Sequence, residues 1–331
     1  MQYTSFGRTG LTVSRLCLGT GTFGKQTDEA ESFRIFDMAA EAGVNFIDTA
    51  DMYPAGVGFD ERGRSEEFTG RWLKGKRNRF ILASKAGGGM GPLPWDQGTS
   101  RKHLFDAVDA SLRRLEVDYI DLYQLHMDDA ATPLDETVEA LDAIVRSGKV
   151  RYIGVSNFLA YRLARALGRQ EALRLARYVS VQPRYNLLFR EIERELLPLA
   201  VEEKLAVIPY NPLAGGLLTD RYQLQDNPET GRFSAELGQF GAMYQKRYWH
   251  QREFETIGKL RDIAAQTGEP LAKLAIAWNL ANPAVTSVIM GASRAEQLRD
   301  TLKSADYALP DSVKAEFDEV TIEYRRGDAG K

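Results

Sequence analysis

Short apolar runs alternate with longer amphipathic segments from one end of the chain to the other. Eight apolar runs predict β-strands, over residues 16–18, 45–47, 80–83, 119–125, 152–155, 179–181, 206–209 and 285–289. Between them, apolar residues at three- and four-residue spacing predict helices over residues 29–42, 101–115, 134–147, 159–175 and 191–203. Such alternation predicts parallel strands joined by helical crossovers.

The spacing of the strands narrows the architecture. Six of the seven steps from one strand start to the next span 27 to 39 residues, which indicates an α/β fold of the (β/α)8 TIM-barrel type. We therefore expect one barrel domain over residues 1–331. The long seventh step predicts a loop over the active face, about residues 211–250, and extra helices over 254–266 and 271–280. Before the first strand, residues 3–14 predict a β-hairpin that closes the barrel bottom.

A glycine motif after the first strand admits a different fold. Gly19, Gly21 and Gly24 satisfy G-x-G-x-x-G, and Asp48 lies 24 residues further on, as in a Rossmann fingerprint. The barrel accounts better for the chain, because a hairpin precedes the strand and eight strand units follow rather than six. In the barrel, Gly19 to Thr22 would form a floor where a cofactor approaches the backbone, and Gly24 would permit a tight turn.

Composition excludes several classes of function. The 331 residues are 44% hydrophobic and 27% charged, with a formal charge of -3, which favours a folded protein without a strong field for nucleic acid or anionic membrane. No stretch approaches the ~18 apolar residues of a membrane span, and the N-terminus lacks a secretion signal. The only cysteine is Cys17, so we expect a reducing cytoplasm. Three scattered histidines predict no metal site. The oligomeric state stays open.

Four polar residues stand at or just past the ends of predicted strands. Asp48, Tyr53, Lys85 and His126 would converge on one face of the barrel, where active sites form. A nearby ammonium lowers the pKa of a phenol from ~10 and makes it a better acid at neutral pH. We expect Lys85 to do this for Tyr53, Asp48 to keep Lys85 protonated, and His126 to align the substrate oxygen. Each residue alone has a structural explanation, but the four together favour catalysis.

Several motifs carry a family resemblance. GVNFIDTADMY at residues 43–53, SEE at 65–67, ILASK ending at Lys85, DYIDLYQLH ending at His126 and VRYIGVSNF around Ser156 stand in the order of the aldo-keto reductase superfamily. The chain resembles this family over nearly its whole length, especially its bacterial and potassium-channel β-subunit branches. The resemblance implies carbonyl reduction in which Tyr53 is the general acid and NADPH supplies the hydride.

The resemblance also implies where NADP(H) binds. Residues after the fifth and sixth strands would hold the nicotinamide carboxamide, and an aromatic side chain after the seventh would stack on its ring. The next loop would line the pyrophosphate, although Asn211 replaces the usual Ser. The expected cofactor contacts are Gly21, Thr22, Asp48, Ser156, Asn157, Gln182, Tyr210, Asn211, Pro212, Leu213, Gly215, Leu217, Arg221, Arg232, Gly291, Ser293, Arg294, Gln297 and Asp300.

The segment after the eighth strand favours NADP over NAD. Gly291, Ser293 and Arg294 open a helix, so N–H groups, a hydroxyl and a guanidinium would surround a 2′-phosphate. Gln297 and Asp300 match adenine contacts of the family. Thr301 stands where Asn is usual, so that contact departs from the family pattern.

The resemblance implies a small carbonyl or alcohol as the substrate, without indicating which one. The expected pocket residues are Phe23, Tyr53, Trp95, His126 and Met127, with Tyr248 and Trp249 as further aromatic candidates. An insertion over residues 54–64 directly follows Tyr53. Two alternatives remain. In the first, the protein is an NADP-binding sensor with low turnover, which the resemblance to the channel branch permits. In the second, it is a lyase in which Lys85 forms a Schiff base, and this requires an amine that is not paired with Asp48.

Overall fold

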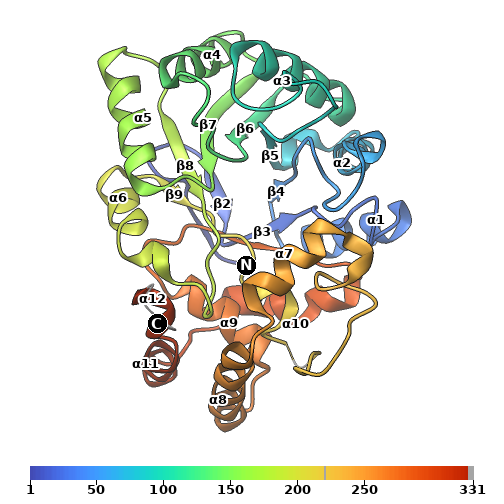
Figure 1. Cartoon of the computed structure of the whole chain (residues 1–331), viewed down its shortest axis with the longest axis vertical. Helices are drawn as coiled ribbons and strands as arrows, with labels where there is room; N and C mark the ends of the chain where they lie inside the picture. The colour runs from blue at the N-terminus through green and yellow to red at the C-terminus, as the bar shows by residue number, and fades with distance from the viewer. Residues whose placement is uncertain (220, 327–331) are drawn as a thin grey trace.

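Eight parallel strands form a closed barrel in the computed structural model, which describes residues 1–219 and 221–326. Their order is β10-β3-β4-β5-β6-β7-β8-β9. The strands are β3 (Leu16–Gly19), β4 (Phe46–Asp48), β5 (Ile81–Ala86), β6 (Ile120–Leu125), β7 (Val150–Ser156), β8 (Tyr178–Gln182), β9 (Ala206–Val207) and β10 (Val288–Met290). Val207 bridges Val285, and the N–H of Ile289 donates to the carbonyl of Pro209 at 2.9 Å, which closes the ring. The predicted (β/α)8 barrel is confirmed (Figure 1).

The ladder where the ring closes is shorter than predicted. β9 covers two residues rather than 206–209, because Pro209 has no N–H with which to continue the ladder. On the other side, Val285 makes only an isolated bridge, and β10 begins at Val288. The remaining strands lie close to their predicted positions.

Helices surround the barrel where the apolar periodicity predicts them (Figure 1). These are α1 (Glu29–Glu41), α3 (Arg101–Leu115), α4 (Leu134–Arg146), α5 (Ala160–Ala172), α6 (Leu196–Glu202), α8 (Gln251–Thr267) and α9 (Leu271–Leu280). Side chains of Asp28 and Ser100 cap α1 and α3 by accepting bonds from free backbone N–H groups. The predicted helix 191–203 begins as a 3₁₀ turn and continues as α6.

The apolar spacing did not predict several other helices. They are α2 (Arg64–Leu73), α7 (Gln239–Tyr248), α11 (Asp311–Val320) and α12 (Glu323–Arg326), while α10 (Leu298–Leu302) follows the segment expected to open a helix. In α2 the inward face includes the buried polar residues Ser65, Glu66 and Thr69. Only Trp72 and Leu73 at its end are buried apolar residues, so the polar residues interrupt the apolar spacing that identified the other helices.

The N-terminal hairpin closes the bottom of the barrel, as predicted. β1 (Tyr3–Ser5) pairs antiparallel with β2 (Thr12–Ser14). Phe6, at the turn, is buried in the barrel interior, with its ring edge-on to Phe46 at 5.6 Å between centroids. Gly7 has a positive φ, and a Cβ there would lie 2.7 Å from the backbone nitrogen of Ala206. Glycine is therefore needed where the hairpin meets the strand.

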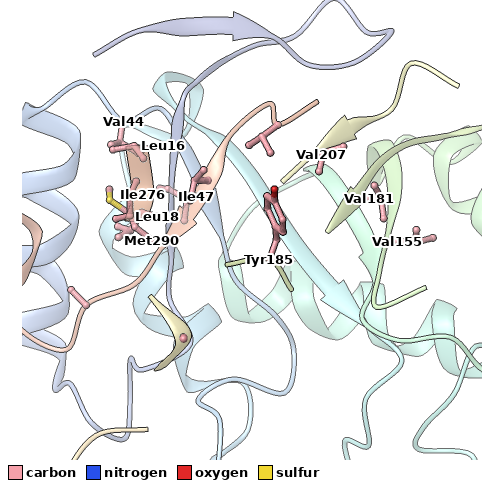
Figure 2. Close-up of a cluster of buried hydrophobic side chains, with 14 of the residues drawn as sticks. Leu16, Leu18, Val44, Ile47, Val155, Val181, Tyr185, Val207, Ile276 and Met290 are labelled. Carbon is pink, nitrogen blue, oxygen red and sulfur yellow. The ribbon is translucent and has the colours of Figure 1, made fainter. Parts of the chain in front are cut away.

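A second apolar layer lies between the strands and the helices. Figure 2 shows Leu16, Leu18, Ile47, Ile276 and Met290 gathered in this layer. Leu16 and Leu18 face the helices, whereas Cys17 between them belongs to the cluster inside the barrel. Across residues 1–219 and 221–326, the structure contains no helix with the length and apolarity needed to cross a bilayer.

Candidate active site

Asp48 and Lys85 form a buried ion pair at the C-terminal ends of β4 and β5. The Lys85 Nζ donates to Asp48 Oδ2 at 2.5 Å and to the carbonyl oxygen of Thr49 at 2.8 Å. Burial alone lowers the pKa of Lys85, but the charges of Asp48 and Tyr53 reverse the shift and raise it above its ordinary value. Lys85 is therefore held as an ammonium.

Two glutamine side chains fix the other oxygen of Asp48. Gln124 on β6 donates to Asp48 Oδ1 at 3.1 Å, and Gln182 at the end of β8 donates to it at 2.9 Å. Both are buried. Gln124 is a site residue that the sequence analysis missed, although its place two residues before His126 gives it the inward orientation of the strand end. With the amides on one oxygen and Lys85 on the other, Asp48 has a fixed orientation.

Tyr53 and His126 lie above this pair. The Lys85 Nζ is 5.0 Å from the centroid of the Tyr53 ring, and the rings of Tyr53 and His126 meet edge to face at 5.6 Å. Burial and the charge of Lys85 lower the pKa of His126 to about 3. The structure thus brings the four predicted residues together, with a neutral imidazole beside the phenol.

The pKa of Tyr53 departs from the simple expectation. Burial raises it, while the charge of Lys85 and a hydrogen bond to Lys85 lower it. The net shift is upward, because the loss of hydration outweighs the ammonium. Lys85 therefore favours the phenolate, as predicted, but does not bring the phenol below its ordinary pKa in the protein alone.

The predicted nicotinamide residues cluster beside His126. Asn157 has a positive φ of 58° and donates from Nδ2 to the His126 carbonyl at 2.9 Å. Its Oδ1 accepts from the hydroxyl of Tyr210 at 2.8 Å, and the hydroxyl of Ser156 donates to the Gln182 carbonyl at 2.8 Å. Because the Nε2 of Gln182 donates to Asp48 Oδ1 at 2.9 Å and to Gln124 Oε1 at 3.3 Å, only its Oε1 is left, as an acceptor for a carboxamide.

The loop after β9 differs from the expected phosphate cradle. The Asn211 Oδ1 accepts the N–H of Gly215 at 2.6 Å, so this N–H is not free for a phosphate. Gly215 has a φ of 74°, and a Cβ there would lie 2.8 Å from the Tyr244 ring. Pro212 and Leu217 are buried rather than lining the site. Gly215 is therefore needed for the conformation of the turn and for its packing against Tyr244.

Arg232 from the same loop reaches the mouth of the barrel. Its Nη2 lies 3.5 Å from the position a Cβ would take at Gly21, and the Tyr53 ring lies 3.6 Å from that position. The guanidinium packs over Phe240 and Tyr244 and has no carboxylate partner among the described residues. The other predicted arginine, Arg221, instead donates to Thr230 within the loop.

A cavity of about 300 Å³ lies where the 2′-phosphate was expected. It is lined by Gln26, Thr27, Asp28, Glu31, Arg34, Ser293, Arg294 and Glu296. Gln26 and Glu31 were missed, because they approach the last strand only in the folded chain. Glu31 Oε1 accepts the Ala295 N–H at 2.6 Å, and Arg34 bridges Glu31 and Glu296.

The neighbouring predicted contacts have partners of their own. Gln297 accepts the N–H of Ser293 at 2.9 Å, and Asp300 pairs with Lys303 at 3.0 Å. Both side chains are therefore already engaged within the protein at the position where adenine contacts were expected. The Thr22 hydroxyl donates to the Ala292 carbonyl at 2.8 Å, which ties the first strand end to the segment that follows Gly291.

The predicted substrate pocket is corrected in part. Phe23 is fully buried and packs on Phe36 in the core, so it cannot line an open pocket. Tyr248 is also buried. Trp249 donates to the Leu224 carbonyl at 3.0 Å within the long loop. Trp95 and Met127 are exposed, and they lie in the loops that follow β5 and β6, the strands that position Lys85 and His126. The insertion forms a 3₁₀ turn, Phe59–Glu61, with Arg62 stacked over Phe59.

Comparison with known proteins adds independent findings. The Aldo/keto reductase family model matches residues 15–322. The chain is 40% identical over 321 residues to "Uncharacterized oxidoreductase YrpG" of Bacillus subtilis, which covers 95% of this chain and 94% of the relative. It is 37% identical over 311 residues to a "Probable voltage-gated potassium channel subunit beta" of Arabidopsis thaliana, covering 92% of each. It is also 33% identical over 310 residues to the "L-glyceraldehyde 3-phosphate reductase" of Escherichia coli K12, covering 92% of this chain and 87% of that one.

Proposed function

The chain belongs to the aldo/keto reductase family, and on that premise we propose that it is an NADPH-dependent reductase of aldehydes or ketones that also catalyses the reverse oxidation of alcohols. The observation that carries this proposal is the buried Lys85–Asp48 pair at 2.5 Å, directly beneath the Tyr53 ring and beside His126. A charged lysine has no structural reason to be fully buried at a strand end unless its charge is used, since burying it costs free energy.

The residues present fit a dinucleotide cofactor. Arg232 is a half-buried guanidinium without a carboxylate partner among the described residues, and it lies over Gly21 where a bulkier residue would block approach. Ser293 and Arg294 line a cavity on the same side. Ser156, Asn157 and Tyr210 would hold the nicotinamide, and Arg232 the pyrophosphate. When bound, NADPH supplies the hydride.

Tyr53 supplies the proton in this mechanism. Its hydroxyl donates to the substrate oxygen as negative charge develops there, and the phenolate that remains is stabilised by the ammonium of Lys85. Asp48 keeps that ammonium protonated and oriented. In alcohol oxidation the same phenolate accepts the hydroxyl proton.

His126 orients the substrate as a neutral donor. Its Nδ1 is buried without a hydrogen-bond partner among the described residues. An orphaned buried N–H is rarer than an orphaned acceptor, so we assign the ring proton to Nε2. That N–H would hydrogen-bond the substrate oxygen next to Tyr53.

A second candidate is an NADP-binding regulatory protein with low turnover. The similarity to a potassium channel β-subunit favours it. The Schiff-base alternative is disfavoured, because Lys85 is paired with Asp48 and its pKa is raised rather than lowered. A single cysteine agrees with action in the cytoplasm.

The test is a panel of aldehydes and ketones with NADPH absorbance as the readout. Turnover of at least one class that is lost in Tyr53→Phe supports the reductase. Tight NADP binding without turnover of any carbonyl or alcohol in the panel would favour the regulatory protein.

A further inference from the structure

A second charged cluster is buried behind Lys85, outside the barrel interior. Asp51 in the loop after β4 and Glu66 on α2 are both fully buried. Arg114 on α3 donates to Glu66 Oε2 from Nε at 2.7 Å and pairs with it through Nη2 at 2.7 Å. The hydroxyl of Ser84, the residue before Lys85, donates to Glu66 Oε1 at 2.5 Å. Both carboxyl oxygens of Glu66 thus have partners, Ser84 on Oε1 and Arg114 on Oε2.

The carboxyl group of Asp51 has no such side-chain partners. Neither carboxyl oxygen has a hydrogen-bond partner of good geometry among the described residues, and the hydroxyl of Tyr123 on β6 is equally unpartnered. The backbone of Asp51 is nevertheless tied to the site, because its N–H donates to the Lys85 carbonyl at 3.1 Å. The charged or titratable groups that face Asp51 are Glu66, Arg114, Lys85, Arg62 and Tyr123.

The buried charges around Asp51 favour a proton on it, because Lys85 is already paired with Asp48 and no ion pair joins Arg62 to Asp51 among the described residues. Two buried carboxyl groups face one guanidinium, and that guanidinium is committed to Glu66 through two nitrogens. An isolated buried carboxylate is costly, so the unsupported acid takes up a proton instead. Burial and the charge of Glu66 raise the pKa of Asp51 to about 8, against the opposing effects of Arg114, the backbone N–H of Met52 and Lys85.

We propose that Asp51 is a positioning residue that carries a proton in the working enzyme, and that its ionisation places a negative charge behind Lys85 and Tyr53. Tyr53 lies two residues further along the same loop, and Lys85 shares a backbone hydrogen bond with Asp51. A new negative charge at Asp51 favours the ammonium of Lys85 and disfavours the phenolate of Tyr53. The effect on turnover rests on the proposed reductase function, whereas the buried proton does not.

The first experiment measures stability against pH in Asp51→Asn, which mimics the protonated acid. An unfolded Asp titrates near pH ~4, whereas folded Asp51 titrates at about pH 8. Between these values the folded state binds the extra proton, so this group makes the wild type less stable as pH rises. The melting temperature of Asp51→Asn minus that of wild type should therefore increase by ~4 °C or more from pH 5 to pH 9.

Asp60→Asn is the matched control, because Asp60 is exposed in the same loop. Its melting curve should run parallel to wild type over the whole pH range. If Asp51→Asn also runs parallel to wild type, or is strongly destabilised at neutral pH, Asp51 is ionised in the folded protein and the proposal fails. This readout needs no enzymatic activity.

The second experiment follows alcohol oxidation against pH, since that direction requires the Tyr53 phenolate. Asp51→Asn and wild type should agree near pH 6, and Asp51→Asn should be roughly twofold or more faster at pH 9, where the wild type carries the added charge. In Glu66→Gln, Arg114 no longer has a charged partner in Glu66 and can stabilise the ionised form of Asp51. Asp51 should then ionise at a lower pH, so alcohol oxidation by Glu66→Gln should become slower than that by Asp51→Asn already below pH 7.

Coincident profiles for wild type and Asp51→Asn at pH 9 would overturn the positioning role. If no variant, wild type included, oxidises any alcohol or reduces any carbonyl, the proposed function fails while the stability result still decides whether Asp51 holds a proton.

Discussion

The two ends of the barrel interior are built from the same strands but differ in chemistry. Near the N-terminal ends the inward-facing side chains are apolar: Cys17, Phe46, Ala83 and Leu122, packed with Phe6 of the hairpin. Two residues further along three of these strands they are polar: Asp48, Lys85 and Gln124. Because side chains repeat their direction every second residue, each strand passes from one layer to the other within two positions.

The difference teaches where stability and chemistry reside. The lower layer buries apolar surface and stabilises the fold. The upper layer buries a charge pair and amide groups, which is costly unless every group is bonded, as it is around Asp48. Substitutions in the two layers should therefore separate the two properties.

The largest effect is expected in the upper layer from Lys85→Met. Loss of the ammonium should lower carbonyl reduction roughly 10³-fold or more, because Lys85 is the charge that most favours the Tyr53 phenolate, ahead of Arg232. It should also cost ~3–5 kcal/mol of folding free energy, since Asp48 stays buried without its counter-ion. Steady-state kinetics and chemical denaturation measure the two losses.

The control is the double variant with Asp48→Asn added to Lys85→Met. Removal of both charges should restore much of the stability and none of the activity. Recovery of activity in the double variant, or full activity of Lys85→Met from pH 5 to 9, would remove Lys85 from the mechanism.

In the lower layer, Phe46→Ala should reduce the free energy of unfolding by ~3–5 kcal/mol through the cavity it leaves beside Phe6. At a temperature where the variant is folded, its kcat should stay within a few-fold of wild type. Tyr161→Ala, at an exposed aromatic residue, should change stability little. A large kcat defect in folded Phe46→Ala would show that the layers are not separable.

Tyr53→Phe should sharpen the comparison within the upper layer. It removes the proton donor but keeps the ring that contacts His126, so kcat should fall by roughly 10²-fold or more while NADPH affinity and melting temperature change little. Fluorescence titration with NADPH provides the affinity. Near-normal turnover would refute the assignment of the general acid.

The smallest effect is expected at the adenosine end. Arg294→Ala should weaken NADPH by ~1.5–3 kcal/mol and barely change NADH, because only NADPH carries the 2′-phosphate. Arg299→Ala, an exposed arginine on α10, is the control and should leave both affinities unchanged. Equal losses for the two cofactors in Arg294→Ala would locate the 2′-phosphate elsewhere.

The sequence alone determined the barrel and the meeting of its four chemical residues. Strands and most helices follow from apolar periodicity, and parallel strands place their C-terminal ends on one face. Asp48, Tyr53, Lys85 and His126 could therefore be predicted to converge, although they are far apart in the chain. The hairpin beneath the barrel also followed from its turn and its alternating strands.

Only the tertiary structure decided how these and other side chains are partnered. On the inner face of α2 the apolar spacing is interrupted by Glu66, which is buried with Arg114 and Ser84 from other elements as its partners. The bond from Ala295 to Glu31 joins residues 264 positions apart, and no local pattern encodes it. Burial raises the pKa of Tyr53 by more than Lys85 lowers it, and this burial likewise depends on atoms from many segments. Local sequence specifies periodicity and strand ends, whereas hydration and pairing are set by what the rest of the chain brings into contact.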